Sequence, residues 1–164
     1  MLNNFRLVFL VALLTLSSCG YQLIRSDIAN DVSFSVPTAS NGSSFRGLES
    51  QLTQSTRQQL HSLIGAQLKS GSCDYSLDLT ISKAMRSARV WSRTGGVNMG
   101  LVVLTVRYQL FDNSKQKVLD SSISRTQEFL IGTGEDTGHA FTEAIADVSQ
   151  QIVIEIAEYL TNNN

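Results

Sequence analysis

LVVLTVRYQLF, residues 101–111, is the segment that sets the architecture of this chain. It is dense in β-branched and aromatic residues, which favour extended backbone. Side chains alternate between the two faces of a strand, so the even-numbered residues from 102 to 110 form a wholly apolar face. The opposite face carries Val103, Thr105, Arg107 and Gln109. The segment therefore predicts a long strand with one buried side and one open side.

Three further strands are predicted around this segment. Residues 75–82, YSLDLTIS, alternate strictly between apolar and polar side chains, which is typical of a half-buried strand. Residues 118–131 follow a turn at residues 112–115, and such short links favour an antiparallel arrangement. A shorter first strand over residues 32–36 stops at Pro37, the only proline of the chain.

Two amphipathic helices complete the pattern. One begins near Leu48, and we expect it to end near residues 70–71, where a glycine can adopt the left-handed cap conformation. The other follows the glycine-rich link at residues 132–134, with Asp136 or Thr137 as its cap. Its apolar stripe consists of Phe141, Ile145, Val148, Ile152, Ile156 and Leu160. Each stripe has to be buried against another element.

The predicted order of elements is therefore β-α-β-β-β-α. The fold class is α/β in the broad sense (α+β), a two-layer sandwich of a four-stranded, mostly antiparallel sheet with two helices on one face. The other face of the sheet stays partly open. Residues 31–164 are predicted to form this one domain, because the chain is long enough for one core and too short for two.

The N-terminal residues have the pattern of a signal peptide. Residues 7–16 form an apolar run of ten residues without a charge, preceded by Arg6. As a helix the run would span about 15 Å, roughly half of what a membrane crossing needs. Two small residues, at positions 17–18, then lead directly into Cys19. This junction resembles the lipobox of bacterial lipoproteins.

The lipobox resemblance implies that residues 1–18 are removed and that Cys19 becomes the acylated first residue, carrying palmitate or similar chains. Residues 19–30 would then form a tether between the anchor and the domain. Two or more acyl chains hold a protein stably on a membrane. Gly20 is not the aspartate that favours retention at the inner membrane in enteric lipoproteins, so we expect an outer-membrane location. The alternative is an ordinary secreted protein with a chance cysteine.

Composition limits the partners and the chemistry. The formal charge of the chain is −1, so no overall basic character indicates nucleic acid. Charged residues make up 16% of the chain, below the ~25% of an ordinary soluble domain, and many Ser, Thr, Gln and Asn take their place. Cys73 has no cysteine left to pair with once Cys19 is lipidated, and we expect it to be a small buried residue.

No catalytic or metal-binding motif is recognisable in the sequence. His61 and His139 are far apart in sequence, so no metal ligand set is predicted. No Gly-x-Ser-x-Gly turn is present, and residues 132–138 lack the Gly-Lys-Ser/Thr ending of a phosphate-binding loop. We expect His139 to be a surface residue rather than a general base. The sequence therefore predicts no enzyme activity and no cofactor.

These motifs together resemble the LPS-assembly lipoprotein family, LptE. The resemblance rests on the start Cys-Gly-Tyr-x-Leu at 19–23, the strand LTVRYQLFD at 104–112, Val-Leu-Asp at 118–120 and the C-terminal amphipathic helix, and it covers nearly all of residues 19–161. It implies a plug in the lumen of the outer-membrane β-barrel LptD, which helps that barrel assemble and takes part in transporting lipopolysaccharide to the cell surface. The domain would lie on the periplasmic side or within the lumen.

A second class of function stays open beside this one. A periplasmic-facing auxiliary lipoprotein of another envelope complex, such as an ABC-type lipid transporter accessory or a cell-wall synthase activator, would use a similar small α/β domain. The partner distinguishes the two classes, because only the first predicts a large β-barrel.

Positive charge is concentrated in one predicted hairpin. Residues 75–107 contain five cations and one anion, Asp78, which gives a net charge of +4. Residues 111–164 have a net charge of −6. The cations are Lys83, Arg86, Arg89, Arg93 and Arg107. The planar fork of arginine matches phosphate oxygens, and lipid A carries phosphates. Under the family resemblance, this hairpin is a candidate lipopolysaccharide-binding edge.

Alternation ranks the candidate residues of this edge. Arg86 and Arg107 are expected on the open face, opposite the apolar side of their strands. Strict alternation would turn Lys83 and Arg89 inward, so we expect the strand to bulge or end near Ala84 and rank these two second. The same charges would also suit a solvated hairpin that has to avoid aggregation through its edge.

Overall fold

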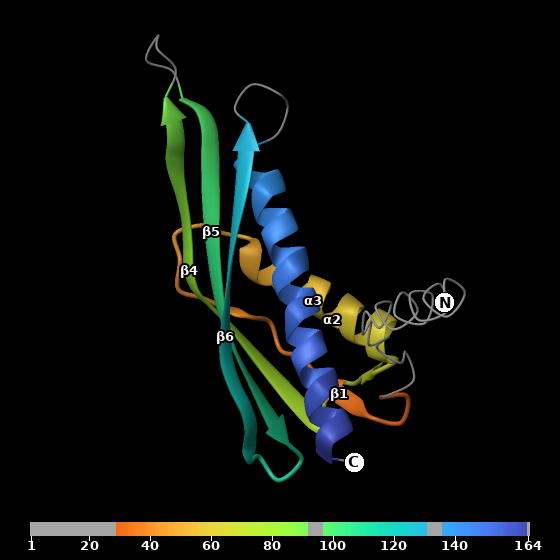
Figure 1. Cartoon of the computed structure of the whole chain (residues 1–164). Helices are drawn as coiled ribbons and strands as arrows, with labels where there is room; N and C mark the ends of the chain where they lie inside the picture. Colours follow the sequence, from red (N-terminus) through yellow and green to blue (C-terminus); the bar gives the residue numbers. More distant parts are fainter. Residues whose placement is uncertain (1–28, 92–96, 131–135, 164) are drawn as a thin grey trace, which may run out of the picture.

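The computed structural model of the chain describes residues 29–91, 97–130 and 136–163. A long twisted sheet forms one layer and two helices form the other (Figure 1). The elements are β1 (Ser33–Ser35), β2 (Ser40–Asn41), α2 (Leu48–Ile64), β3 (Gln67–Leu68), β4 (Tyr75–Trp91), β5 (Val97–Asp112), β6 (Lys117–Leu130) and α3 (Thr137–Asn163). The predicted signal peptide and Cys19 lie outside the described residues.

The sheet is built around the antiparallel meander of β4, β5 and β6. Its strand order is β3-β1-β4-β5-β6, and β2 also pairs with β4. β1 runs parallel to both β3 and β4. The predicted α+β fold class is thus confirmed. β2 and β3 were not predicted, because strands of two residues are too short to show a periodic pattern in the sequence.

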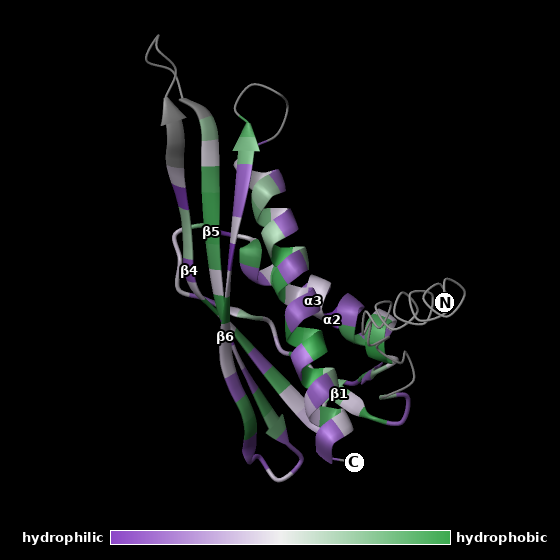
Figure 2. Cartoon of the chain, in the orientation of Figure 1, coloured by the Kyte–Doolittle hydropathy of each residue, from purple (hydrophilic) through white to green (hydrophobic). Residues whose placement is uncertain are grey.

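The core lies between the sheet and the helices. The predicted inner face of β5 is wholly buried, as is the predicted stripe of α3. Where the helices cross, the buried hydroxyls of Thr56 and Ser149 lie 3.3 Å apart. The Tyr108 hydroxyl donates a hydrogen bond to the Glu155 carboxylate of α3. In Figure 2 the upper part of β5 is mainly hydrophobic, whereas the turn between β5 and β6 is mainly hydrophilic.

The end of α2 differs from the prediction. The helix stops at Ile64, and Gly65 adopts the left-handed conformation with φ 73°, its N–H donating to the His61 carbonyl. Gly71 also has a positive φ, 110°, but it lies in the connection to β4. Two glycines in this segment could each have served as the cap, and the earlier one ends the helix. The helix start of α3 is as predicted: the Asp136 carboxylate accepts the His139 N–H at 2.8 Å.

β4 contains the predicted bulge and continues beyond it. The register shifts between Ile81 and Lys83, and the strand then runs on to Trp91 instead of ending near Ala84. The N–H of Gly42, just after β2, donates to the Ile81 carbonyl at 3.0 Å, which holds the bulge against the loop before α2. One extra residue in β4 changes which later side chains face the helices.

The described chain begins inside the core. Ala29 is fully buried, and its N–H donates to the Ile64 carbonyl at 2.9 Å. The last residues of the predicted tether are therefore packed at the C-terminal end of α2. Within the described ranges, no helix combines the length and the apolar character needed to cross a membrane.

Candidate functional site

The open face of the sheet has a polar part below the β4 bulge, which we call the proximal open face. Residues paired across strands point to the same side of a sheet. Thr80, Arg107 and Ser122 form one such row. The hydroxyls of Thr105 and Ser124, on neighbouring strands, lie 3.1 Å apart. This surface is therefore rich in hydroxyl groups, and its charged residues are Asp78, Arg107, Lys117 and Asp120.

Arg107 lies on the open face as predicted, but its guanidinium group already forms an ion pair. Its Nε and Nη2 donate to the two carboxylate oxygens of Asp120, at 2.9 and 2.8 Å. Lys117 and Gln109 donate to the same carboxylate, at 2.6 and 3.1 Å. These donors, with Arg107 first, hold the pKa of Asp120 well below its usual range. The Arg107 side chain, although 55% exposed, is committed to an ion pair within the sheet.

Beyond the bulge the open face carries more apolar residues, although Glu128 and Thr126 pair with Leu101 and Val103 on the same side, and we call this part the distal open face. Its apolar residues are Met85, Met99, Leu101, Val103 and Leu130. Met85 is 37% exposed and Leu130 is 44% exposed, and the other three are half-buried. Lys83, paired with Thr105, borders this patch. The patch was not predicted from the sequence, although Leu101 and Val103 at open-face positions were a usable signal.

The location predicted for Arg86 is wrong. Because the bulge inserts a residue, Arg86 pairs with the buried Val102 and lies on the helix side of the sheet. Its guanidinium lies over the Phe129 ring, 5.7 Å from the centroid. Lys83, which strict alternation turned inward, is instead exposed on the open face. The side chain of Arg89 and all of Arg93 lie outside the described residues.

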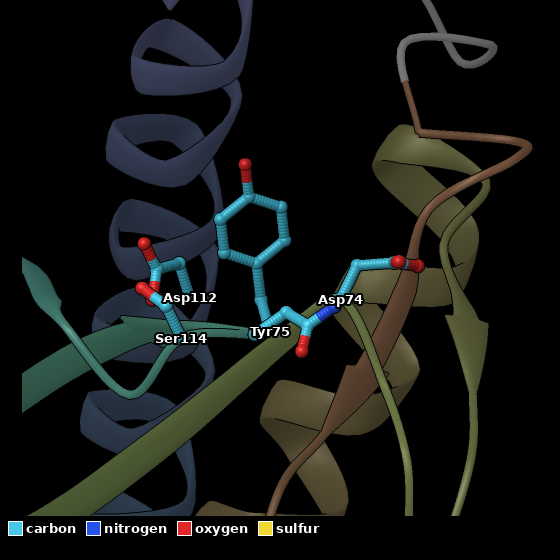
Figure 3. A pocket seen from close by; sticks show the side chains of 5 residues that line it. Asp74, Tyr75, Asp112 and Ser114 are labelled. Carbon is cyan, nitrogen blue, oxygen red and sulfur yellow. The ribbon is translucent and has the colours of Figure 1, made fainter.

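A shallow cavity at the opposite end of the sheet is structural in character. It has a volume of about 490 Å³ and is lined by Asp74, Tyr75, Asp112, Asn113 and Ser114. Figure 3 shows Tyr75 between Asp74 and Asp112. Asp74 accepts hydrogen bonds from the N–H and hydroxyl of Ser33, and Asp112 accepts them from Ser114 and the Gln116 N–H. Both carboxylates therefore stabilise the local backbone: Asp74 holds β1, and Asp112 holds the turn between β5 and β6.

The other residues discussed from the sequence do not form a site. Cys73 is a free thiol and half-buried rather than fully buried. His139 is exposed, with its Nε2 3.4 Å from the Glu143 carboxylate. No cluster of three or more His, Cys, Asp or Glu suited to a metal ion occurs in the part of the chain that the structure describes.

The fold is a small α+β domain with two helices on one face of a sheet built around an antiparallel meander, and comparison with family models identifies its class. The model of the LptE family, described as lipopolysaccharide-assembly, matches residues 32–162. The chain belongs to this family of non-enzymatic lipoproteins. A comparison with curated proteins found no match.

Solved structures support the fold. The hypothetical protein CT253 from Chlamydia trachomatis is similar with a TM-score of 0.60 and 11% identity, over 79% of this chain and 97% of that one. The uncharacterized lipoprotein B from Nitrosomonas europaea has a TM-score of 0.57 and 11% identity, over 79% and 84%. A putative lipoprotein from Caulobacter crescentus has a TM-score of 0.55 and 13% identity, over 84% and 96%. At these identities the likeness concerns the fold alone.

Proposed function

We propose that this chain is an outer-membrane lipoprotein, acylated at Cys19, that plugs and helps assemble the LptD β-barrel and takes part in lipopolysaccharide transport to the cell surface. Membership of the LptE family over residues 32–162 is the observation that carries the proposal. Residues 1–18 would be the signal peptide, and the domain would lie on the periplasmic side or within the barrel lumen. Its role would be assembly and transport, without catalysis.

The proximal open face supports the contact with a barrel wall. The interior of large outer-membrane barrels is polar. Hydroxyl groups such as those of Thr105 and Ser124 both donate and accept hydrogen bonds, so they can pair with a polar wall without burying unpaired charge. The Arg107–Asp120 ion pair compensates two of the charges on this surface.

The distal part of the hairpin supports contact with lipopolysaccharide. Acyl chains would cover the apolar residues of the distal open face, which centre on Leu101 and Val103. Lys83 borders that patch on the same face and can meet a lipid A phosphate there, whereas Arg86 is exposed on the other side of the strand and can meet a phosphate only around the edge of β4. Arg89 belongs to the same proposed set by its place in the sequence. Arg107 ranks below Arg86 and Lys83, because a phosphate would have to displace Asp120 from it.

Affinity purification of the tagged full chain from detergent-solubilised envelopes tests this function. A β-barrel of the LptD type should be recovered in stoichiometric amount. Recovery of an ABC-type lipid transporter or a cell-wall synthase in its place would overturn the proposal and favour the auxiliary-lipoprotein alternative. A tagged outer-membrane lipoprotein of another family serves as the control for non-specific recovery.

A further inference from the structure

The outer edge of β4 has a segment beside which none of the described strands lies. β1 and β2 pair with β4 only as far as Ile81, where the bond from Gly42 closes the pairing. From Lys83 to Ala88, β4 pairs continuously with β5. Among the described strands, β5 is the sole partner of this segment. Figure 1 shows it as the outer strand above the loop between β1 and α2.

Two irregularities bound this segment, residues 83–88, which we call the β4 edge. The register shifts on one side between Ile81 and Lys83, and on the other between Ala88 and Val90. Bulges interrupt regular pairing, so a strand added here could align over six residues, about 20 Å. Such a length allows alternate backbone N–H and C=O groups to pair with a short segment, and the bulges oppose longer edge-to-edge aggregation.

The charged side chains of the β4 edge are all positive. Lys83 and Arg86 are exposed, and no acidic residue occurs between residues 79 and 107. Lys83 makes no ion pair with any described residue, and the contact recorded for Arg86 is the Phe129 ring. The other long edge, β6, differs because it mixes both signs. Its charged residues are Lys117, Asp120, Arg125 and Glu128.

We infer that the β4 edge binds an acidic, extended segment of a partner protein, which it adds as a further strand of the sheet. The backbone hydrogen bonds supply the affinity, and the two cations select the charge of the added strand. A second copy of this chain is the wrong occupant, because pairing two β4 edges would set Lys83 and Arg86 against the same cations. This inference goes beyond lipopolysaccharide transport, since the ligand is a protein segment.

Peptide binding tests the inference with the full chain in detergent micelles. A fluorescent octapeptide of repeating Glu-Glu-Thr-Thr, which places Glu on both faces of an added strand, is titrated and followed by anisotropy. The controls are the corresponding Lys/Thr peptide and the Glu/Thr peptide methylated at every backbone nitrogen. We expect both controls to bind at least about tenfold more weakly, because one is repelled and the other cannot donate hydrogen bonds. Amide hydrogen exchange should slow at residues 83–88 on binding of the acidic peptide.

The double variant Lys83→Glu with Arg86→Glu should reverse the preference towards the Lys/Thr peptide, with circular dichroism verifying its fold. Equal binding of the methylated peptide would overturn the inference, since the attraction would then be charge alone. Absence of binding, or protection confined to β6, would overturn it as well. No lipopolysaccharide or barrel is present in this experiment, so its failure is separate from a failure of the proposed function.

Discussion

Phe129 of β6 supports Arg86 of β4 across the strand between them. The guanidinium of Arg86 lies 5.7 Å from the centroid of the Phe129 ring, within the range of a cation–π contact. The ring in turn lies over Gly100 of β5, where a Cβ atom would come within 3.0 Å of three ring atoms. The absence of a Cβ at Gly100 therefore leaves space for the Phe129 ring, and the ring makes the cation–π contact with Arg86.

Gly100→Ala should destabilise the domain by about 1–3 kcal/mol, because the added methyl group overpacks the buried Phe129 ring. Urea unfolding measures this change. The cost should shrink in a Phe129→Leu background, where the clashing ring atoms are absent. An equal cost of Gly100→Ala in both backgrounds would contradict the arrangement.

Lys83→Ala combined with Arg86→Ala should weaken lipopolysaccharide binding at least about fivefold at low salt, and the loss should diminish at high salt. Binding of the purified full chain to lipopolysaccharide, measured at two salt concentrations, checks this. Arg46→Ala removes an exposed arginine outside the hairpin and is the matched control. Arg107→Ala should have the smaller effect on binding, since Asp120 already holds its fork. If the double variant bound lipopolysaccharide as well as the control does, neither residue would belong to the proposed site.

Ile152→Asp should destabilise the fold by at least about 3 kcal/mol, because it buries an unpaired charge at a fully buried position of α3. Ile145→Asp should act in the same way. Thermal unfolding followed by circular dichroism measures the effect. Gln150→Asp introduces the same side chain on the exposed side of α3 and should be nearly neutral. Similar melting of the two variants would contradict the packing of α3.

The Asp120 cluster should make stability depend on pH in a defined direction. The folded-state pKa of Asp120 is depressed, so its contribution is fully present above the unfolded pKa of about 3.9 and is lost as pH falls through the lower folded pKa. The stability advantage of the wild type over Asp120→Asn should therefore be constant near neutral pH and decrease below about pH 4. Urea midpoints of both proteins across this range measure it. An advantage that grew on acidification would contradict the cluster.

Cys19→Ala should abolish incorporation of a labelled palmitate analogue and release the protein from the outer-membrane fraction, since the thiol is the proposed acylation site. Cys73→Ala is the matched control, because it removes the other cysteine of the chain and should leave labelling unchanged. Labelling that persisted in Cys19→Ala would refute acylation at this residue.

Local sequence patterns were sufficient for much of the fold. The alternation in residues 101–111 and 75–82 predicted β5 and the start of β4, and the apolar stripe of α3 predicted its buried side. These patterns succeed because burial on one face requires a repeat that neighbouring residues carry themselves. The conflict between Lys83 and strict alternation even indicated the bulge.

Long-range pairing determined the rest. β2 and β3 exist only because β4 and β1 lie beside them, and the face of Arg86 depended on where one extra residue entered the register against β5. The engagement of Arg107 by Asp120 and the ring beneath Arg86 join residues on different strands. Neighbours in sequence restrict backbone conformation, whereas the free energy of a side chain's surroundings depends on residues that meet it only after the chain has folded.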